Sequence, residues 1–306
     1  MANPNAPRGA LSLQNVLKYT VQNTDQNAEQ TPNEAADDVE KNQFLENVLS
    51  AMTTDAATAL KAALVILNSD EATADDKLES FDVIRSHIDD IDNANSLVKL
   101  GGTTTLLRYV KDSESEIRVS ALNTVAEMAQ NNTFCQNALI TEKFLPALTK
   151  NLSEANEDIV RSSIYAISSL IRNFPPGYKE FKHINGIKAL VPCLKSPNSN
   201  VYIKAAFLIA SLSSRDKDAR DDFVKAEVFP VLLENLKLVK EFDVKQETTL
   251  FALSSLSLES ELKLSTEKRK EILSILQQII SKNKQTENCE DIVNYARNIV
   301  DNLNAR

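Results

Sequence analysis

The chain has 306 residues, of which 42% are apolar, and its net charge is −9. Such a length can bury an ample core, and the acidity removes the main electrostatic attraction to phosphate backbones and to anionic membranes. Glycine occurs five times and tryptophan is absent, so the composition favours an all-α fold and no nucleic-acid or membrane partner.

Residues 1–37 are rich in Asn, Gln, Thr, Ala and Pro, a composition that cannot bury enough surface to offset the entropy of ordering. We therefore expect a flexible N-terminal segment. One apolar island interrupts it and is suited to a short helix or to an extended ligand; its large side chains are Leu11, Leu13, Val16, Leu17 and Tyr19.

Residues 38–306 are predicted to form one helical-repeat domain. Apolar residues at helical spacing predict a helix over Phe44–Met52 and a second over Leu60–Leu67. Asp75 and Asp76 then stand where the N-terminus of a helix favours negative charge, and the spacing of the following apolar residues predicts one long helix as far as Ile91.

Four related stretches then recur at spacings of 42 to 45 residues: Ala121–Val125, Tyr165–Leu170, Leu208–Leu212 and Phe251–Leu256. Periods just above forty are typical of armadillo and HEAT repeats. Each unit shows a short helix, a second helix introduced at Gly102, Lys143, Gly186 or Glu227, and a long helix that contains the recurring stretch. This pattern predicts a right-handed armadillo-repeat solenoid of about four three-helix repeats.

Two further details belong to this prediction. Asn200 is expected to be the N-cap of the helix that contains Lys204. The repeat fades after residue 260 into two amphipathic helices, Ile272–Ile280 and Ile292–Leu303, which suit a polar-faced cap.

Three cysteines, Cys135, Cys193 and Cys289, are odd in number and far apart, which predicts reduced thiols that fill the core. The first twenty residues contain no apolar run of signal-peptide length, and the longest such run, Ala62–Leu67, is too short to span a bilayer. We therefore expect a cytoplasmic or nuclear protein.

Catalytic signatures are missing: the sequence contains neither a glycine-rich phosphate loop nor a nucleophile elbow. His87 and His183 lie far apart and have no second ligand at metal-binding spacing. The sequence therefore predicts a binding protein that is not an enzyme and needs no cofactor or metal. Arg118, Arg161 and Lys204 each precede a recurring stretch by a few residues and form either a basic ladder or ordinary solvated positions.

Four segments carry a resemblance to a known family: Asp92–Asn95 at the end of the first predicted long helix, Gln130–Asn132 and Leu170–Asn173 at the ends of the next two, and Lys204–Leu208. In this order and spacing they resemble the armadillo-type nucleotide exchange factors of the 70-kDa heat-shock chaperones, the Fes/HspBP group. The resemblance covers residues 39 to about 260 and weakens through the C-terminal cap. Ser12–Leu17 is similar to the leucine-rich island that opens these proteins.

The resemblance implies a monomeric co-chaperone that clamps the ATPase domain of the chaperone, promotes ADP release and thereby releases the client. It implies that the chaperone-binding residues are Ala94, Lys204, Asn93, Asn131, Arg172 and Asn173. For the last four, the alternative is that the side chains only cap turns. Because such chaperones bind short apolar stretches, our hypothesis is that the N-terminal island mimics a client peptide, and the alternative is an inert solubilising tail. The rival function is an adaptor that holds an extended peptide, but such adaptors use a ladder of Trp and Asn, and the recurring stretches here contain only Asn123.

Overall fold

The computed structural model describes residues 56–238, 242–258 and 262–305. The chain divides into two units, Met1–Thr53 and Thr54–Arg306, and the described helices belong to the second. The predicted N-terminal segment 1–37, its apolar island and the predicted helix Phe44–Met52 lie outside the described residues.

Every regular element of the described residues is a helix, which confirms the all-α prediction. Helical residues 56–67 and α3 (Ala74–Arg85) precede four repeats. The repeats are α4 (Ile91–Lys99), α5 (Gly102–Tyr109) and α6 (Ser115–Ala129); α7 (Thr133–Thr141), α8 (Phe144–Asn151) and α9 (Glu157–Ile171); α10 (Pro175–His183), α11 (Gly186–Leu190) with the 3₁₀ helix η1 (Val191–Lys195) and α12 (Ser199–Ser213); and α13 (Lys217–Lys225), α14 (Val228–Leu233) and α15 (Val244–Ser257). The predicted C-terminal pair is present as α16 (Thr266–Asn283) and α17 (Glu290–Asn304).

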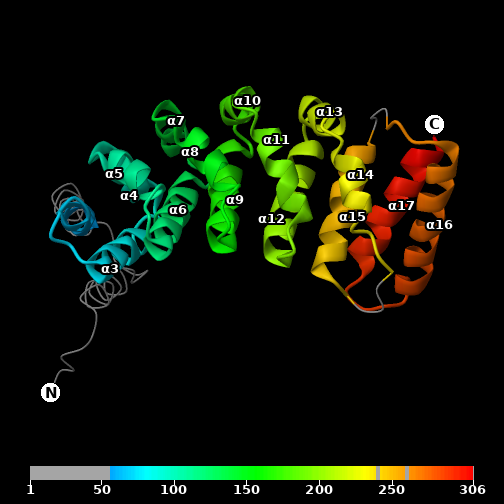
Figure 1. The fold of residues 1–306 in the computed structure, drawn as a ribbon, viewed down its shortest axis with the longest axis horizontal. Helices are drawn as coiled ribbons and strands as arrows, with labels where there is room; N and C mark the ends of the chain where they lie inside the picture. Colours follow the sequence, from blue (N-terminus) through cyan, green and yellow to red (C-terminus); the bar gives the residue numbers. More distant parts are fainter. Residues whose placement is uncertain (1–55, 239–241, 259–261, 306) are drawn as a thin grey trace, which may run out of the picture. The chain divides into compact units, whose positions relative to one another are not determined.

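The third helices of the repeats pack side by side in chain order, and α17 continues this row against α15 (Figure 1). The shorter helices of the repeats form a second row along the same unit (Figure 1). One continuous core runs between the rows and includes the rings of Phe81, Phe144, Phe181 and Phe223. Most alanine, leucine and isoleucine residues of the recurring stretches are buried in this core, so that small side chains let neighbouring helices approach closely.

The second helix of each repeat begins after a residue with left-handed backbone: Gly101, Lys143, Asn185 and Glu227, with φ of 79°, 61°, 59° and 57°. This conformation is uncommon for residues other than glycine, so its return in all four described repeats marks a fixed turn. The positions predicted from the sequence agree with these turns to within one residue.

The N-cap of α12 is Asn198, so the prediction of Asn200 is wrong. The backbone of Asn198 is extended, and its Oδ1 accepts hydrogen bonds from the N–H groups of Asn200 (2.8 Å) and Val201 (3.4 Å). Asn200 therefore lies within the first turn and donates to the cap.

The predicted long helix as far as Ile91 is interrupted. α3 ends at Arg85, and Asp90 caps a new helix, α4, by accepting hydrogen bonds from the N–H groups of Asp92 (2.8 Å) and Asn93 (3.0 Å). The segment Asp92–Asn95 thus belongs to the first turns of α4 and does not end a long helix, as the sequence had suggested.

All three cysteines are buried free thiols, as predicted. Burial raises the pKa of Cys135 to about 12 and that of Cys193 to about 11, which keeps both protonated at neutral pH. They serve as core-filling residues.

Candidate functional site

A row of aromatic side chains crosses four successive helices of the long-helix row. We call the set Tyr165, Phe207, Phe251 and Tyr295, on α9, α12, α15 and α17, the aromatic row. The ring centroids of Phe207 and Phe251 are 6.2 Å apart, and Phe251 stacks on Tyr295 at 5.1 Å. Because 44% of Phe207 is exposed, the middle of the row is open to solvent.

Two cations lie against this row. The Nζ of Lys204 is 5.0 Å from the centroid of the Tyr165 ring, and the guanidinium of Arg172 is 5.6 Å from that of Phe207. Cation–π contacts of this kind hold a positive charge without neutralising it. Burial, with a smaller contribution from Arg161, lowers the pKa of Lys204.

Neither cation has a carboxylate partner in the part of the chain that the structure describes. The Nε of Arg172 is also buried without a hydrogen-bond partner. An unpaired, partly desolvated cation beside exposed aromatic rings is a typical contact for an acidic or hydroxyl-bearing partner surface.

The first long helices differ in this respect. Arg85 forms a bidentate ion pair with Glu127, with N–O distances of 2.6 and 2.8 Å, and Arg118 pairs with Glu154 at 3.0 Å. Arg161 is 3.0 Å from Asp158. The predicted basic ladder therefore consists of two paired arginines and one lysine, Lys204, that has no carboxylate partner among the described residues.

The predicted contact residues of the long helices lie at two kinds of position. Lys204 is within α12, and Arg172 is the C-cap of α9. Asn131 and Asn173 follow α6 and α9 with left-handed backbone, φ 56° in both, which is a common way to end a helix. The Oδ1 of Asn173 also accepts a hydrogen bond from Arg215 (2.9 Å). The Asn173 side chain thus has a contact within the fold, and both asparagines follow their helices with left-handed backbone.

Ala94 and Asn93 belong to α4, in the first repeat, whereas Lys204 belongs to the third. Ala94 is only 1% exposed and is part of the core. The Nδ2 of Asn93 donates to the carbonyl of His87 (3.1 Å) and so closes the turn between α3 and α4. The structure does not place these two side chains beside the aromatic row.

Sequence reasoning missed the aromatic row, although a signal was present. Tyr165 and Phe251 head two of the recurring stretches, Phe207 directly precedes a third, and Tyr295 follows Phe251 at the same period of about forty residues. In α6 the equivalent residue is Ser120, so the row begins at α9.

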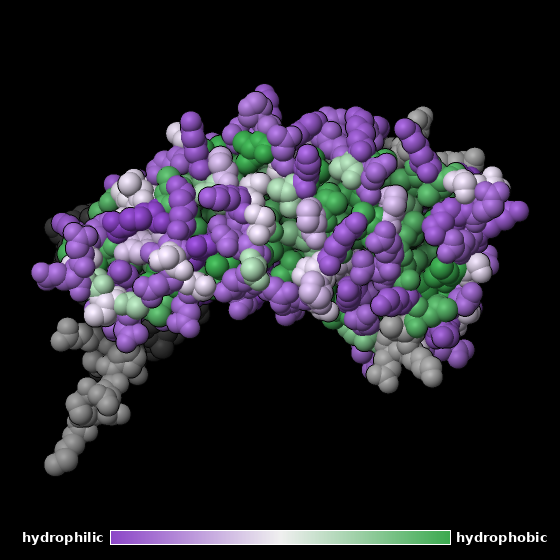
Figure 2. Space-filling model, in the orientation of Figure 1, coloured by the Kyte–Doolittle hydropathy of each residue, from purple (hydrophilic) through white to green (hydrophobic). Residues whose placement is uncertain are grey.

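Hydropathy varies along the side of the molecule that is drawn in Figure 2. Figure 2 shows more hydrophobic surface over α12–α17 than over α3–α9. On this side of the molecule the later repeats therefore offer the more apolar surface.

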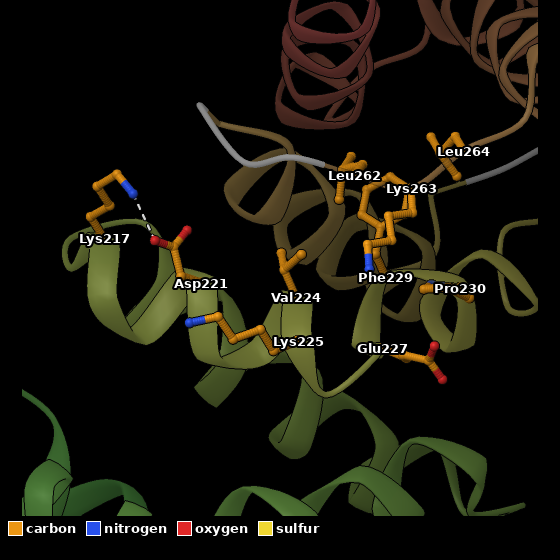
Figure 3. A pocket seen from close by; sticks show the side chains of 10 residues that line it. All are labelled: Lys217, Asp221, Val224, Lys225, Glu227, Phe229, Pro230, Leu262, Lys263 and Leu264. Atoms are coloured by element: carbon orange, nitrogen blue, oxygen red, sulfur yellow. Dashed lines mark hydrogen bonds and ion pairs between the residues drawn. The ribbon is translucent and has the colours of Figure 1, made fainter.

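A pocket of about 600 Å³ lies apart from the aromatic row, between α13, α14 and residues 262–264 (Figure 3). Val224, Phe229 and Leu262 contribute apolar lining, and the Nζ of Lys217 binds Asp221 at 2.6 Å. This ion pair lowers the pKa of Asp221. No set of three or more His, Cys, Asp or Glu side chains within the described ranges is placed to hold a metal ion.

The three-helix repeats and the row of long helices define an armadillo-type helical-repeat protein. Solved structures with this fold include the designed armadillo repeat protein YIII(Dq)4CqI, with a TM-score of 0.63, 16% identity, and coverage of 80% of this chain and 99% of that one. Computationally designed armadillo repeat proteins for modular peptide recognition match with a TM-score of 0.64 and 16% identity over 79% of this chain and 99% of that one. No helix in the described ranges combines the length and the apolar composition that crossing a membrane takes.

Family comparisons are more specific. The family described as "Nucleotide exchange factor Fes1" matches residues 13–97, and the "SIL1/FES1/HPBP1 C-terminal domain" matches residues 93–212. "Hsp70 nucleotide exchange factor FES1" of Coccidioides immitis is 33% identical over 178 residues, which is 56% of this chain and 83% of that protein. The protein of the same name from Candida glabrata is 28% identical over 73% of this chain and 79% of its own length. The chain belongs to the Fes1 family of Hsp70 nucleotide exchange factors, which confirms the resemblance stated from the sequence.

Proposed function

We propose that this protein binds the ATPase domain of an Hsp70 chaperone through the exposed side of α9 and α12 and thereby promotes the release of ADP and of the client. The observation that carries the proposal is the pair of cations, Lys204 and Arg172, held over aromatic rings without carboxylate partners among the described residues. Together with the family membership, it gives the partner an electrostatic point of attachment.

Exchange of this kind requires no catalytic residue on this chain. A protein that prefers the opened form of the ATPase domain weakens ADP binding by the same factor by which ADP weakens its own binding. A hundredfold effect corresponds to roughly 2.7 kcal/mol of coupling, which lies within the range that allosteric proteins reach. A surface that discriminates between two forms of the partner is sufficient.

The six residues suggested by the resemblance then divide into two roles. Lys204 and Arg172 touch the chaperone, with Asn131 and Asn173 beside them at the ends of the long helices. Ala94 and Asn93 act indirectly, because Ala94 packs in the core and Asn93 fixes the turn before α4.

The test is the release of a fluorescent ADP analogue from the Hsp70 partner, followed by stopped flow at fixed salt. Lys204→Glu replaces an attraction with a repulsion, so we expect slower exchange, with Lys204→Ala intermediate between this variant and the wild type. Lys188→Glu is the matched control, because it makes the same charge change at an exposed position on α11. A wild-type protein that leaves ADP release unchanged contradicts the function, whereas a Lys204→Glu variant as fast as wild type contradicts only the role of Lys204.

The N-terminal segment is assigned a second task. In this proposal its island (Leu11, Leu13, Val16, Leu17 and Tyr19) occupies the peptide groove of the chaperone and keeps the released client from rebinding. Tethering to a docked body raises its local concentration toward the millimolar range, so that a weak peptide becomes effective.

Deletion of residues 1–33, or replacement of Leu13 and Leu17 by Ser, should leave ADP release intact and slow net client release when client is in excess. Equal client release by the truncated and the full chain contradicts this role. The protein is proposed to act as a monomer in the cytoplasm, which analytical ultracentrifugation and microscopy of a tagged chain test separately.

A further inference from the structure

The aromatic row extends beyond the stretch that the two family domains match. That stretch ends at residue 212, yet Phe251 and Tyr295 continue the row on α15 and α17. Their rings stack at 5.1 Å, and the centroid of the Phe251 ring is 6.2 Å from that of the exposed Phe207. From Phe207 onward the rings thus form a continuous strip that reaches into the last repeat and the C-terminal cap.

Charges flank the strip, and their sign changes along it. One turn before each ring lies a charged residue: Arg161 and Lys204 on α9 and α12, then Glu247 and Asp291 on α15 and α17. Lys204 precedes its ring by three residues and the other three charged residues precede theirs by four. Residues three or four apart on a helix are neighbours on its surface, so these charges lie on the side of their helices from which the rings project.

The acidic end is also without partners. Burial raises the pKa of Glu247 and the nearby Asp291 adds to the effect, while burial, Asp291 and Glu247 together raise the pKa of Tyr295. No ion pair to either carboxylate exists among the residues described. Two like charges held close together without a cation favour a cationic group from outside.

We propose that the aromatic row is the anchor of the chaperone contact. In this proposal an apolar side chain of the partner packs on Phe207 and Phe251, an acidic group of the partner binds Lys204, and a basic group binds Glu247. The occupant follows from charge complementarity at both ends of the strip, and its identity as Hsp70 rests on the proposed function. Exposed aromatic side chains at the centre of an interface commonly dominate its affinity.

The decisive variant is Phe207→Ala, and the chain offers a closely matched control. Phe134 on α7 is 45% exposed, against 44% for Phe207, and it likewise lies beneath a cation, with the Nζ of Lys99 6.0 Å from its centroid. Phe134→Ala therefore removes the same ring at the same exposure away from the strip.

Affinity for the isolated ATPase domain of the Hsp70 partner is measured by titration calorimetry at fixed salt, with the urea midpoint of each variant recorded beside it. Phe207→Ala should weaken binding at least about tenfold, which corresponds to about 1.4 kcal/mol, while Phe134→Ala stays within about twofold of wild type. Glu247→Lys tests the order of charges along the strip, because it should weaken binding if a basic group of the partner lies at Glu247.

A photo-crosslinking phenylalanine analogue at position 207 keeps an aromatic ring in place and provides a second measurement if Phe207→Ala lowers the urea midpoint. Crosslinks to the ATPase domain from position 207, and none from position 134, support the anchor. Wild-type affinity of Phe207→Ala, or tighter binding by Glu247→Lys, overturns the anchor while the function proposed above stands. If the wild-type protein does not bind the ATPase domain at all, both proposals fall together.

Discussion

Ala94→Arg should unfold the first repeat. Ala94 is enclosed in α4 among core residues, so the substitution forces a long cationic side chain into a space that now holds one methyl group. Overpacking costs about 1–3 kcal/mol, and an uncompensated buried charge costs roughly 3–5 kcal/mol. These amounts approach the whole free energy of unfolding of an ordinary domain, about 5–15 kcal/mol.

A repeat protein can limit this loss by melting locally. Since each repeat contacts mainly its neighbours, the penalty cannot exceed the free energy of opening α4 together with α5 and α7, against which it packs. We therefore expect early loss of amide protection in these helices and near-normal protection in α12 and α15.

The assay combines urea unfolding with native-state hydrogen exchange, and Ala62→Arg is the control because Ala62 is an exposed alanine on a helix. An Ala94→Arg variant that keeps the wild-type urea midpoint and exchange pattern, yet fails to bind Hsp70, would refute the reasoning. It would place Ala94 directly at the contact. Loss of binding together with loss of protection fits the indirect role.

Three further predictions concern the body of the protein. Because the pKa of Cys135 is about 12, only about one Cys135 thiol in ten thousand is ionised at pH 8. Iodoacetamide should therefore alkylate Cys135 in urea and not in the native protein. Equal alkylation rates in both states would contradict this prediction. Glu247→Gln should stabilise the protein at neutral pH. Burial and Asp291 raise the pKa of Glu247 in the folded state, so the ionised carboxylate lowers the free energy of unfolding as pH rises through that pKa. The gain in urea midpoint should vanish at lower pH, and a gain that is independent of pH contradicts this cause. Gly186→Ala should lower the urea midpoint, because a Cβ there would lie 2.2 Å from the ring of Phe181, and an unchanged midpoint would show that the ring can move.

The arrangement of the repeats could be predicted from the sequence because the residues that determine it recur within each repeat. Small residues such as Ala166 and Ala252 must return wherever two long helices pack closely, and that spacing is visible without coordinates. The turns before the second helices were visible for a similar reason, since the position of Gly101 requires an unusual backbone that few residues adopt readily.

Helix boundaries were less predictable where two neighbouring residues are both suited to cap the helix. Asn198 and Asn200 are the same residue type, and the choice depends on which of them has extended backbone. At the start of the domain, Ile88 and Ile91 continue the helical spacing of α3, but Ile88 is buried while Ile91 is exposed at the start of α4. Apolar spacing alone does not distinguish a continuous helix from two helices joined by an Asp90 cap.

In the candidate site, too, the sequence period predicts some features, whereas others depend on how the repeats pack. The ring positions could be predicted, because Tyr165, Phe207 and Phe251 stand at equivalent places in their repeats. Their electrostatic state could not, because it depends on pairing across repeats. Where α6 has Ser120 in place of a ring, the arginine of the preceding long helix reaches Glu127 and the charges cancel within the fold.

From α9 onward a ring fills the equivalent position, and Lys204 and Arg172 lie on aromatic faces, although Arg161 still pairs with Asp158. A cation that lies on an aromatic ring keeps its positive charge and can attract another molecule, whereas a cation in an ion pair is largely neutralised by the carboxylate of the same chain. Lys204 and Arg172 therefore differ from the paired arginines Arg85 and Arg118 of the earlier long helices. This difference is the reason why we propose the partner contact on α9 and α12.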